Sequence, residues 1–158
     1  MIKDSGNRTE FETGAVRDVQ VGKGRCDLLP LDVINEFLGG VSILNPLLRI
    51  HHFQCTGDWM HLLLALSDFG NDCGWDKTTS VLEVSKQFED GAVKYGENNW
   101  QKGIPVNCYI NSAIRHYLKW LRGDNDEPHD RAFCWNLICA AWTCKNKPEL
   151  NGYGKEDE

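Results

Sequence analysis

The sequence has neither a long hydrophobic run nor an excess of basic residues, and both absences exclude classes of function. No stretch approaches the roughly 20 apolar residues that cross a bilayer, and residues 1–12 lack the apolar segment of a signal peptide. The 158 residues carry 17 Lys and Arg against 23 Asp and Glu, a formal net charge of −6. Because duplex DNA is bound through a basic face, we expect neither duplex nucleic acid nor a membrane as a partner. A nucleotide is not excluded, because bound metal ions reverse the local field.

Cysteine pairs at metal-binding spacing and several catalytic motifs are also missing. The seven Cys are an odd number and no C-x-x-C occurs, so a reduced, cytosolic protein is expected rather than a disulfide scaffold. The chain has no P-loop, no G-x-S-x-G and no H-E-x-x-H. A structural zinc site is one functional hypothesis, added to the two that are given below. Its ligands would be His51, His52, His61 and Cys55 or Cys73, which lack a standard zinc-binding spacing.

Apolar periodicity indicates an all-α protein, a small helical bundle of about four to five helices with an N-terminal loop region. Apolar side chains recur every three or four residues over 81–95 and 110–122, and the segment 128–142 is apolar nearly all round. Ser80 followed by Glu83 is a capping-box pattern. Shorter helices are predicted over 31–38 and 59–66, and no segment alternates as a strand does.

The length favours one domain. Residues 1–13 are polar and predicted to form a flexible arm, and residues 14–145 a single helical domain. Within that domain, residues 41–77 are interpreted as an insertion. The charged tail, residues 146–158, is predicted to fray.

An acidic turn is the first candidate for chemistry. Asp124, Asp126, Glu127 and Asp130 place four carboxylates within seven residues, and the last two share one face of a helix start. Hard divalent cations need such oxygen ligands. Acidic residues at a helix start also complement the helix dipole, which is the structural alternative.

Polar residues on the two C-terminal helices are the second candidate. Asn136 lies within an apolar run and must find hydrogen-bond partners if it is buried; it is either a structural link to a neighbouring helix or the floor of a pocket. Arg115 and His116 lie off the apolar stripe, which suits the surface. The same two residue types also suit phosphate binding and proton transfer near neutral pH.

The segment around residue 96 is the third candidate. Glu89 lies at the edge of an apolar stripe, where a carboxylate can point along a helix interface or reach solvent. A loop rich in Asn and Gly follows, flanked by Lys94, Trp100 and Lys102. Its backbone N–H groups, cations and aromatic face suit a nucleotide.

Five blocks along the chain resemble a known family when taken together. They are Gly14-Ala-Val-Arg17-Asp18, Gly22-Lys-Gly-Arg25-Cys-Asp27-Leu-Leu-Pro30, Gly91-Ala-Val-Lys94-Tyr95-Gly96-Glu-Asn-Asn99-Trp100-Gln-Lys-Gly103, Ser112-Ala-Ile-Arg115-His116 and Gly123-Asp-Asn-Asp126-Glu127-Pro-His129 with Trp135-Asn136-Leu137. This order resembles the N-terminal domain of phage dATP/dGTP diphosphohydrolases and, more distantly, the MazG-like all-α NTP pyrophosphatases.

The resemblance implies a bundle that hydrolyses dATP or dGTP to a dNMP and pyrophosphate with Mg²⁺ or Mn²⁺, in phage nucleotide metabolism in a bacterial host cytoplasm. A homo-oligomer is implied as well. The metal ligands would be Glu89, Asp126, Glu127 and Asp130, and the catalytic residues Glu127, Asp130 and His129. The substrate would contact Lys94, Tyr95, Asn99, Trp100, Lys102, Arg115, His116 and Asn136.

One motif of the MazG-like enzymes is missing. Those enzymes carry E-x-x-E on one helix and E-x-x-D on the next; Glu127-Pro-His-Asp130 fits the second motif, but Glu89 is followed by Ala92 three residues later. The alternative function is therefore a non-catalytic module that binds a nucleotide or a protein partner.

Overall fold

The computed structural model describes residues 3–39 and 45–155. Over these ranges the chain forms six α-helices, one two-stranded antiparallel hairpin and three 3-10 turns. The helices are α1 (Leu31–Phe37), α2 (Pro46–Thr56), α3 (Met60–Asp72), α4 (Lys77–Tyr95), α5 (Val106–Arg122) and α6 (His129–Asn146). The strands are β1 (Arg8–Glu10) and β2 (Val16–Asp18), and the 3-10 turns are η1 (Cys26–Leu28), η2 (Asn99–Lys102) and η3 (Pro148–Leu150).

The helical class is confirmed, but the number of helices is six rather than four to five. The sequence analysis missed α2 and the hairpin. Each strand has only three residues, which is too short for the alternation of a half-buried strand to be recognised. No described helix has the length and apolar character needed to cross a membrane.

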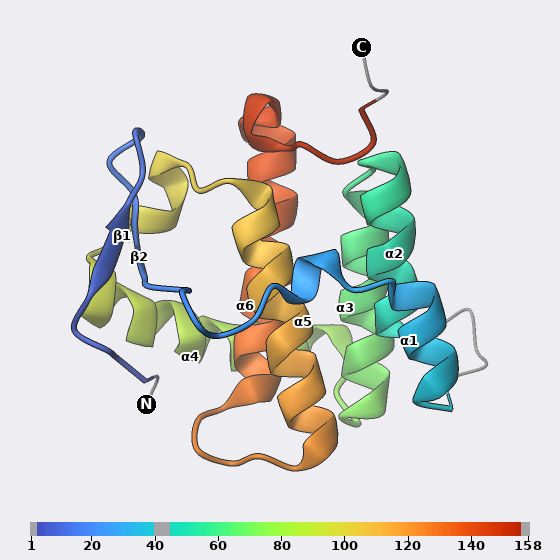
Figure 1. The fold of residues 1–158 in the computed structure, drawn as a ribbon. Coiled ribbons are helices and arrows are strands. Elements are labelled where there is room, and N and C mark those ends of the chain that lie inside the picture. The colour runs from blue at the N-terminus through green and yellow to red at the C-terminus, as the bar shows by residue number, and fades with distance from the viewer. Residues whose placement is uncertain (1–2, 40–44, 156–158) are drawn as a thin grey trace.

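Helices α5 and α6 form the centre of the molecule (Figure 1). Helices α1 to α3 lie on one side of this pair, and α4 and the hairpin lie on the other. The ring of Phe69 on α3 lies 4.7 Å from that of Phe133 on α6 and 4.8 Å from that of Trp120 on α5, measured between centroids. Two fully buried rings, Phe69 and Phe133, and the partly buried Trp120 thus hold three helices together.

The helix ends follow local sequence signals, with one correction. Helix α4 begins at Lys77, because the side chain of Asp76 accepts a hydrogen bond from the Thr79 N–H at 2.7 Å. The capping box predicted at Ser80 is therefore wrong, and Ser80 is buried inside the helix. The predicted stops at Gly96 and Gly123 are confirmed, with φ of 91° and 86°, values that side chains disfavour.

The described part of the segment 41–77 forms α2 and α3, which share the main core. Asn45 accepts a hydrogen bond from the Leu47 N–H, and Pro46 occupies the first helical position. Six apolar side chains of the two helices are fully buried: Leu47, Ile50, Phe53, Leu62, Ala65 and Phe69. The rest of the predicted insertion, residues 41–44, lies outside the described residues.

Both ends of the described chain contact the helices. In the segment assigned to a flexible arm, β1 pairs with β2, Arg8 opposite Asp18. In the C-terminal tail, the ring of Tyr153 packs on Phe53 of α2 at 5.2 Å between centroids. Neither contact could be anticipated from local periodicity, because the strands have three residues each and Tyr153 lies far from Phe53 in the sequence.

We predict that Phe69→Ala lowers the free energy of unfolding by about 3–5 kcal/mol, because it leaves a cavity between three helices. The matched control is Val93→Ala at an exposed position of α4, which should stay within about 0.5 kcal/mol of the parent. Urea unfolding followed by Trp fluorescence measures both. Equal effects of the two substitutions would contradict this placement of the core.

Candidate functional site

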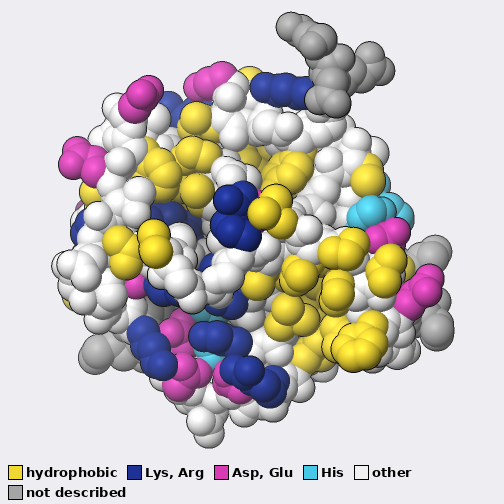
Figure 2. Space-filling model, viewed as in Figure 1, with side chains coloured by type: hydrophobic (Ala, Val, Ile, Leu, Met, Phe, Trp, Pro, Cys, Tyr) yellow, Lys and Arg dark blue, Asp and Glu magenta, His cyan; other side chains and the backbone are white. Residues whose placement is uncertain are grey.

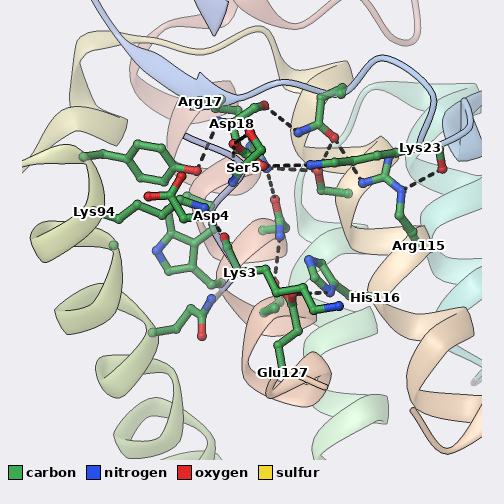
Figure 3. Close-up of a pocket in the computed structure, with 18 of the residues that line it drawn as sticks. Lys3, Asp4, Ser5, Arg17, Asp18, Lys23, Lys94, Arg115, His116 and Glu127 are labelled. Carbon is green, nitrogen blue, oxygen red and sulfur yellow. Dashed lines mark hydrogen bonds and ion pairs between the residues drawn. The ribbon is translucent and has the colours of Figure 1, made fainter. Parts of the chain in front are cut away.

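A cavity of about 830 Å³ opens between the N-terminal hairpin and helices α4, α5 and α6 (Figure 3). Residues from both the first 26 positions and the three helices line it. In Figure 2, viewed as in Figure 1, Lys, Arg, Asp and Glu side chains gather below the centre of the face. This volume is in the usual range for a small-molecule site.

The cavity carries an excess of positive charge, although the chain as a whole is acidic. Seven basic side chains line it: Lys3, Arg17, Lys23, Lys94, Arg115, Lys119 and Arg122. Three acidic side chains do so: Asp4, Asp18 and Glu127. Among the described residues, Arg17, Lys94, Arg115 and Lys119 form no ion pair with a carboxylate. Such a field favours an anionic ligand.

Arg17, at the centre of β2, is the most buried of these cations. It is only 8% exposed. Its Nη2 donates to the Ser112 hydroxyl at 3.0 Å and to Asn136 Oδ1 at 3.2 Å. Its guanidinium carbon lies 5.1 Å from the ring centroid of Tyr109. Nη1 has no hydrogen-bond partner. A buried guanidinium with a free donor and no carboxylate is costly unless an anion completes it.

Arg115 on α5 fixes the loop after β2. Its three guanidinium nitrogens donate to Gln20 Oε1 at 3.1 Å and to the carbonyls of Lys23 and Gly24, each at 3.2 Å. Burial lowers the pKa of this guanidinium. Because all three acceptors are neutral, the charge of Arg115 is not cancelled and adds to the positive field of the cavity.

The face of α4 that lines the cavity carries no carboxylate. Gln87, Gly91, Lys94 and Tyr95 occupy it. The Tyr95 hydroxyl accepts a hydrogen bond from the Asp18 N–H at 3.1 Å, and Lys94 donates to the carbonyl of Lys3. Helix α4 therefore positions the N-terminal strand and supplies one cation.

Two further polar atoms of cavity-lining residues are buried without a partner. They are Oε1 of Gln87 on α4 and Nε1 of Trp135 on α6. Buried polar groups in native proteins are normally satisfied. The acceptor and the donor belong to residues that line one cavity, although the two atoms themselves have almost no accessible surface.

A histidine and carboxylate cluster lies at one end of the cavity. His129 is 2% exposed; its Nε2 lies 2.6 Å from Asp126 Oδ1 and its Nδ1 lies 2.9 Å from His116 Nδ1. Glu127 Oε1 is 3.7 Å from His116 Nδ1. Burial, followed by the charge of His129, lowers the pKa of His116, so this imidazole stays neutral. The atoms are close enough together to hold a metal ion.

The structure brings most of the sequence-predicted site residues together. Those that line the cavity are Lys94, Tyr95, Asn99, Arg115, His116, Glu127 and Asn136. His129 and Asp126 contact that set directly. Asn99 also clamps β2, since its amide bonds both the N–H and the carbonyl of Val16.

Four predicted residues lie elsewhere. Glu89 and Lys102 are exposed and do not line the cavity. Trp100 packs edge-on against Trp142 and Phe88 instead of facing the cavity. Asp130 lies one residue, about 100° of helix, past His129. Its charge acts on Cys73, the residue after α3: burial and then the Asp130 charge raise the pKa of the Cys73 thiol to about 12.

The sequence analysis did not single out Arg17, Gln87 or Lys3 as site residues. The family-like block Gly14-Ala-Val-Arg17-Asp18 contained the one available signal for Arg17. The ligands of the zinc hypothesis form no group of three close donor atoms in the described residues. His51 does lie 3.8 Å from the Cys55 sulfur.

We predict that Asn136→Ala lowers the free energy of unfolding by about 1–3 kcal/mol, because the buried Arg17 then loses an acceptor. Asn146→Ala is the matched control. Asn146 makes the same bond to the carbonyl four residues earlier on the same helix, but it is exposed, so its loss should cost less than about 0.5 kcal/mol.

A double-mutant cycle with Arg17→Met isolates the contact between the two side chains. The cost of Asn136→Ala should shrink when Arg17 is already gone. An unchanged cost would show that Asn136 acts through its helix alone.

A comparison with known protein families found a family that is similar to the C-terminal half of the chain. Neither the curated proteins nor the solved structures include a match. A family model described as dATP/dGTP diphosphohydrolase, N-terminal, matches residues 77–152, the stretch from α4 to just after η3. The matched segment thus includes the face of α4 that carries Lys94 and Tyr95, Arg115 and His116 on α5, and the acidic turn. This match covers just under half of the chain, and residues 77–152 are thus similar to the dATP/dGTP diphosphohydrolase N-terminal domain family.

Proposed function

We propose that the chain binds a purine deoxynucleoside triphosphate in the basic cavity and hydrolyses it, with a divalent cation, to a dNMP and pyrophosphate. The observation that carries this proposal is Arg17, a buried guanidinium on the cavity wall with a free Nη1 and no carboxylate partner among the described residues. A phosphate oxygen would supply the missing acceptor, and guanidinium–phosphate contacts are among the strongest hydrogen bonds in proteins.

The remaining cations suit a polyphosphate. Lys94, Arg115 and Lys119 line the cavity without ion pairs to carboxylates in the described chain, so several phosphate oxygens can be neutralised at once. The two open polar atoms, Gln87 Oε1 and Trp135 Nε1, offer an acceptor and a donor to the edge of a base. The family name supports a purine deoxynucleotide as the substrate.

Hydrolysis requires that water attack the α-phosphorus while the bond to the bridging oxygen of the pyrophosphate group breaks. Glu127 would hold the divalent cation together with the neighbouring His116 and His129, and the cation would polarise the phosphoryl group. With the cation bound, the attacking water would lose its proton to solvent. Phosphoryl transfer depends on such positioning and charge neutralisation.

A nucleotide-binding module without hydrolysis is the second candidate. One observation favours it: the cavity face of α4 carries no carboxylate, whereas the MazG-like enzymes carry E-x-x-E on one helix. The chain does not fit a metal centre built from two pairs of carboxylates. The setting that goes with either candidate is phage nucleotide metabolism in a bacterial cytoplasm.

We predict that Arg17→Gln weakens binding of dATP and dGTP about 10- to 150-fold, the equivalent of one charged hydrogen bond of about 1.5–3 kcal/mol. The control is Lys86→Gln, which removes one positive charge from α4 outside the cavity and should change affinity little. Calorimetry on both purified variants, with circular dichroism as a check of folding, measures the effect. Equal losses would assign the effect to net charge and contradict the role of Arg17.

We predict pyrophosphate release from dATP or dGTP that depends on Mg²⁺ or Mn²⁺ and stops with EDTA. Glu127→Gln should reduce the rate at least about 100-fold, because it removes a charge at the reacting centre. The control Glu149→Gln, on η3 away from the cavity, should keep the parental rate. Nucleotide binding without release from any dNTP would reject hydrolysis and establish the binding module.

A further inference from the structure

The imidazole pair at the end of the cavity places two ring nitrogens and one carboxylate within reach of a single metal ion. Two histidine nitrogens, His116 Nδ1 and His129 Nδ1, face each other at 2.9 Å, and Glu127 Oε1 lies 3.7 Å from the first. Two donors that bind one ion at about 2.1 Å and at right angles are about 3.0 Å apart. We propose that His116, His129 and Glu127 form a binding site for one first-row transition-metal ion, and that Asp126 positions His129 without binding the ion.

The acidic turn offers no competing set of free oxygens. Asp126 uses Oδ1 for His129 and Oδ2 for the Lys3 ammonium, at 2.6 and 2.5 Å. Asp124 uses both oxygens for the Arg122 guanidinium, at 2.7 and 2.5 Å. Glu127, by contrast, has only the 3.7 Å contact of Oε1 with His116 Nδ1 among the described residues. The carboxylate that remains free to bind an ion is therefore the one beside the two imidazoles.

The Asp126 contact selects which nitrogen of His129 is available. A carboxylate on Nε2 holds the ring proton there and leaves the lone pair on Nδ1, which points to His116 and Glu127. Metal-binding histidines commonly donate their other N–H to a carboxylate in this way. Lys3, from the N-terminal segment, holds that carboxylate in turn through an ion pair.

The donor set selects the class of ion. Two imidazoles and one carboxylate suit Mn²⁺, Fe²⁺, Co²⁺ or Zn²⁺, whereas Mg²⁺ prefers oxygen ligands throughout. Three protein ligands leave open positions for water or a phosphate oxygen. This inference deepens the proposed function, because the ion would lie at the wall of the same cavity, but the site binds an ion whether or not the nucleotide is hydrolysed.

The test is binding of Co²⁺ and Mn²⁺ by metal-free protein in the absence of nucleotide. We expect one Co²⁺ per chain with visible absorption bands, displaced by Mn²⁺ or Zn²⁺ and retained in excess Mg²⁺. His116→Gln and Glu127→Gln each remove a ligand and should weaken Co²⁺ binding by more than the about 10- to 100-fold typical of a supporting residue.

Asp126→Asn is the milder variant, which keeps the hydrogen-bonding shape. It should weaken Co²⁺ binding about 10- to 100-fold and leave the positions of the absorption bands unchanged. If its spectrum changes in the same way as that of Glu127→Gln, Asp126 is a ligand and its positioning role is overturned. The control His52→Gln, on the exposed surface of α2, should bind like the parent. Absence of 1:1 binding, or binding lost in His52→Gln and kept in His116→Gln, would overturn the site.

The outcome is separable from the proposed function. Calorimetry with dATP and EDTA reports nucleotide binding without any ion. If dATP binds while Co²⁺ does not, the metal site is rejected and nucleotide binding in the cavity stands. If Co²⁺ binds while dATP does not, nucleotide binding is rejected and the metal site stands.

Discussion

The burial of one unpaired guanidinium organises this molecule. Arg17 reaches from β2 into the space between α5 and α6, where Ser112 and Asn136 bind one of its nitrogens and the ring of Tyr109 covers its face. A buried charge is tolerated only when hydrogen bonds and counter-charges replace lost water. The described chain supplies the hydrogen bonds and leaves the counter-charge to a ligand, so the same contact that attaches the hairpin to the helices also creates an anion site.

The cavity depends on parts of the chain far apart in sequence. The segment that matches the family, residues 77–152, provides α4, α5 and α6. Four residues from outside this segment complete the wall of the cavity: Lys3, Arg17, Asp18 and Lys23. Arg115 links the two parts through the loop after β2. Any ligand of this cavity therefore meets both parts, and the matched segment alone would lack the most buried cation.

The helices of the C-terminal half could be predicted from the sequence because their apolar periodicity is long and their ends carry Gly96 and Gly123. Helix α2 could not be predicted in this way, because polar residues such as His51 and His52 interrupt its apolar pattern. The pair Asn45-Pro46 was nevertheless a sequence signal for the start of a helix. Predicted residues in short motifs, such as Arg115 and His116, do line the cavity. Asp130 was grouped with Glu127, but it does not line the cavity, because the direction of a side chain around a helix could not be derived from the spacing alone.

The central claim is that a purine deoxynucleoside triphosphate occupies the cavity against Arg17. The most direct measurement is the ¹H–¹⁵N spectrum of the Trp indole and Arg guanidinium groups during titration with dATP. The account predicts that the Trp135 indole and the Arg17 guanidinium signals shift together and saturate at one nucleotide per chain. Saturating dATP that leaves both signals unmoved, or shifts only indoles outside the cavity such as that of Trp59, would contradict it.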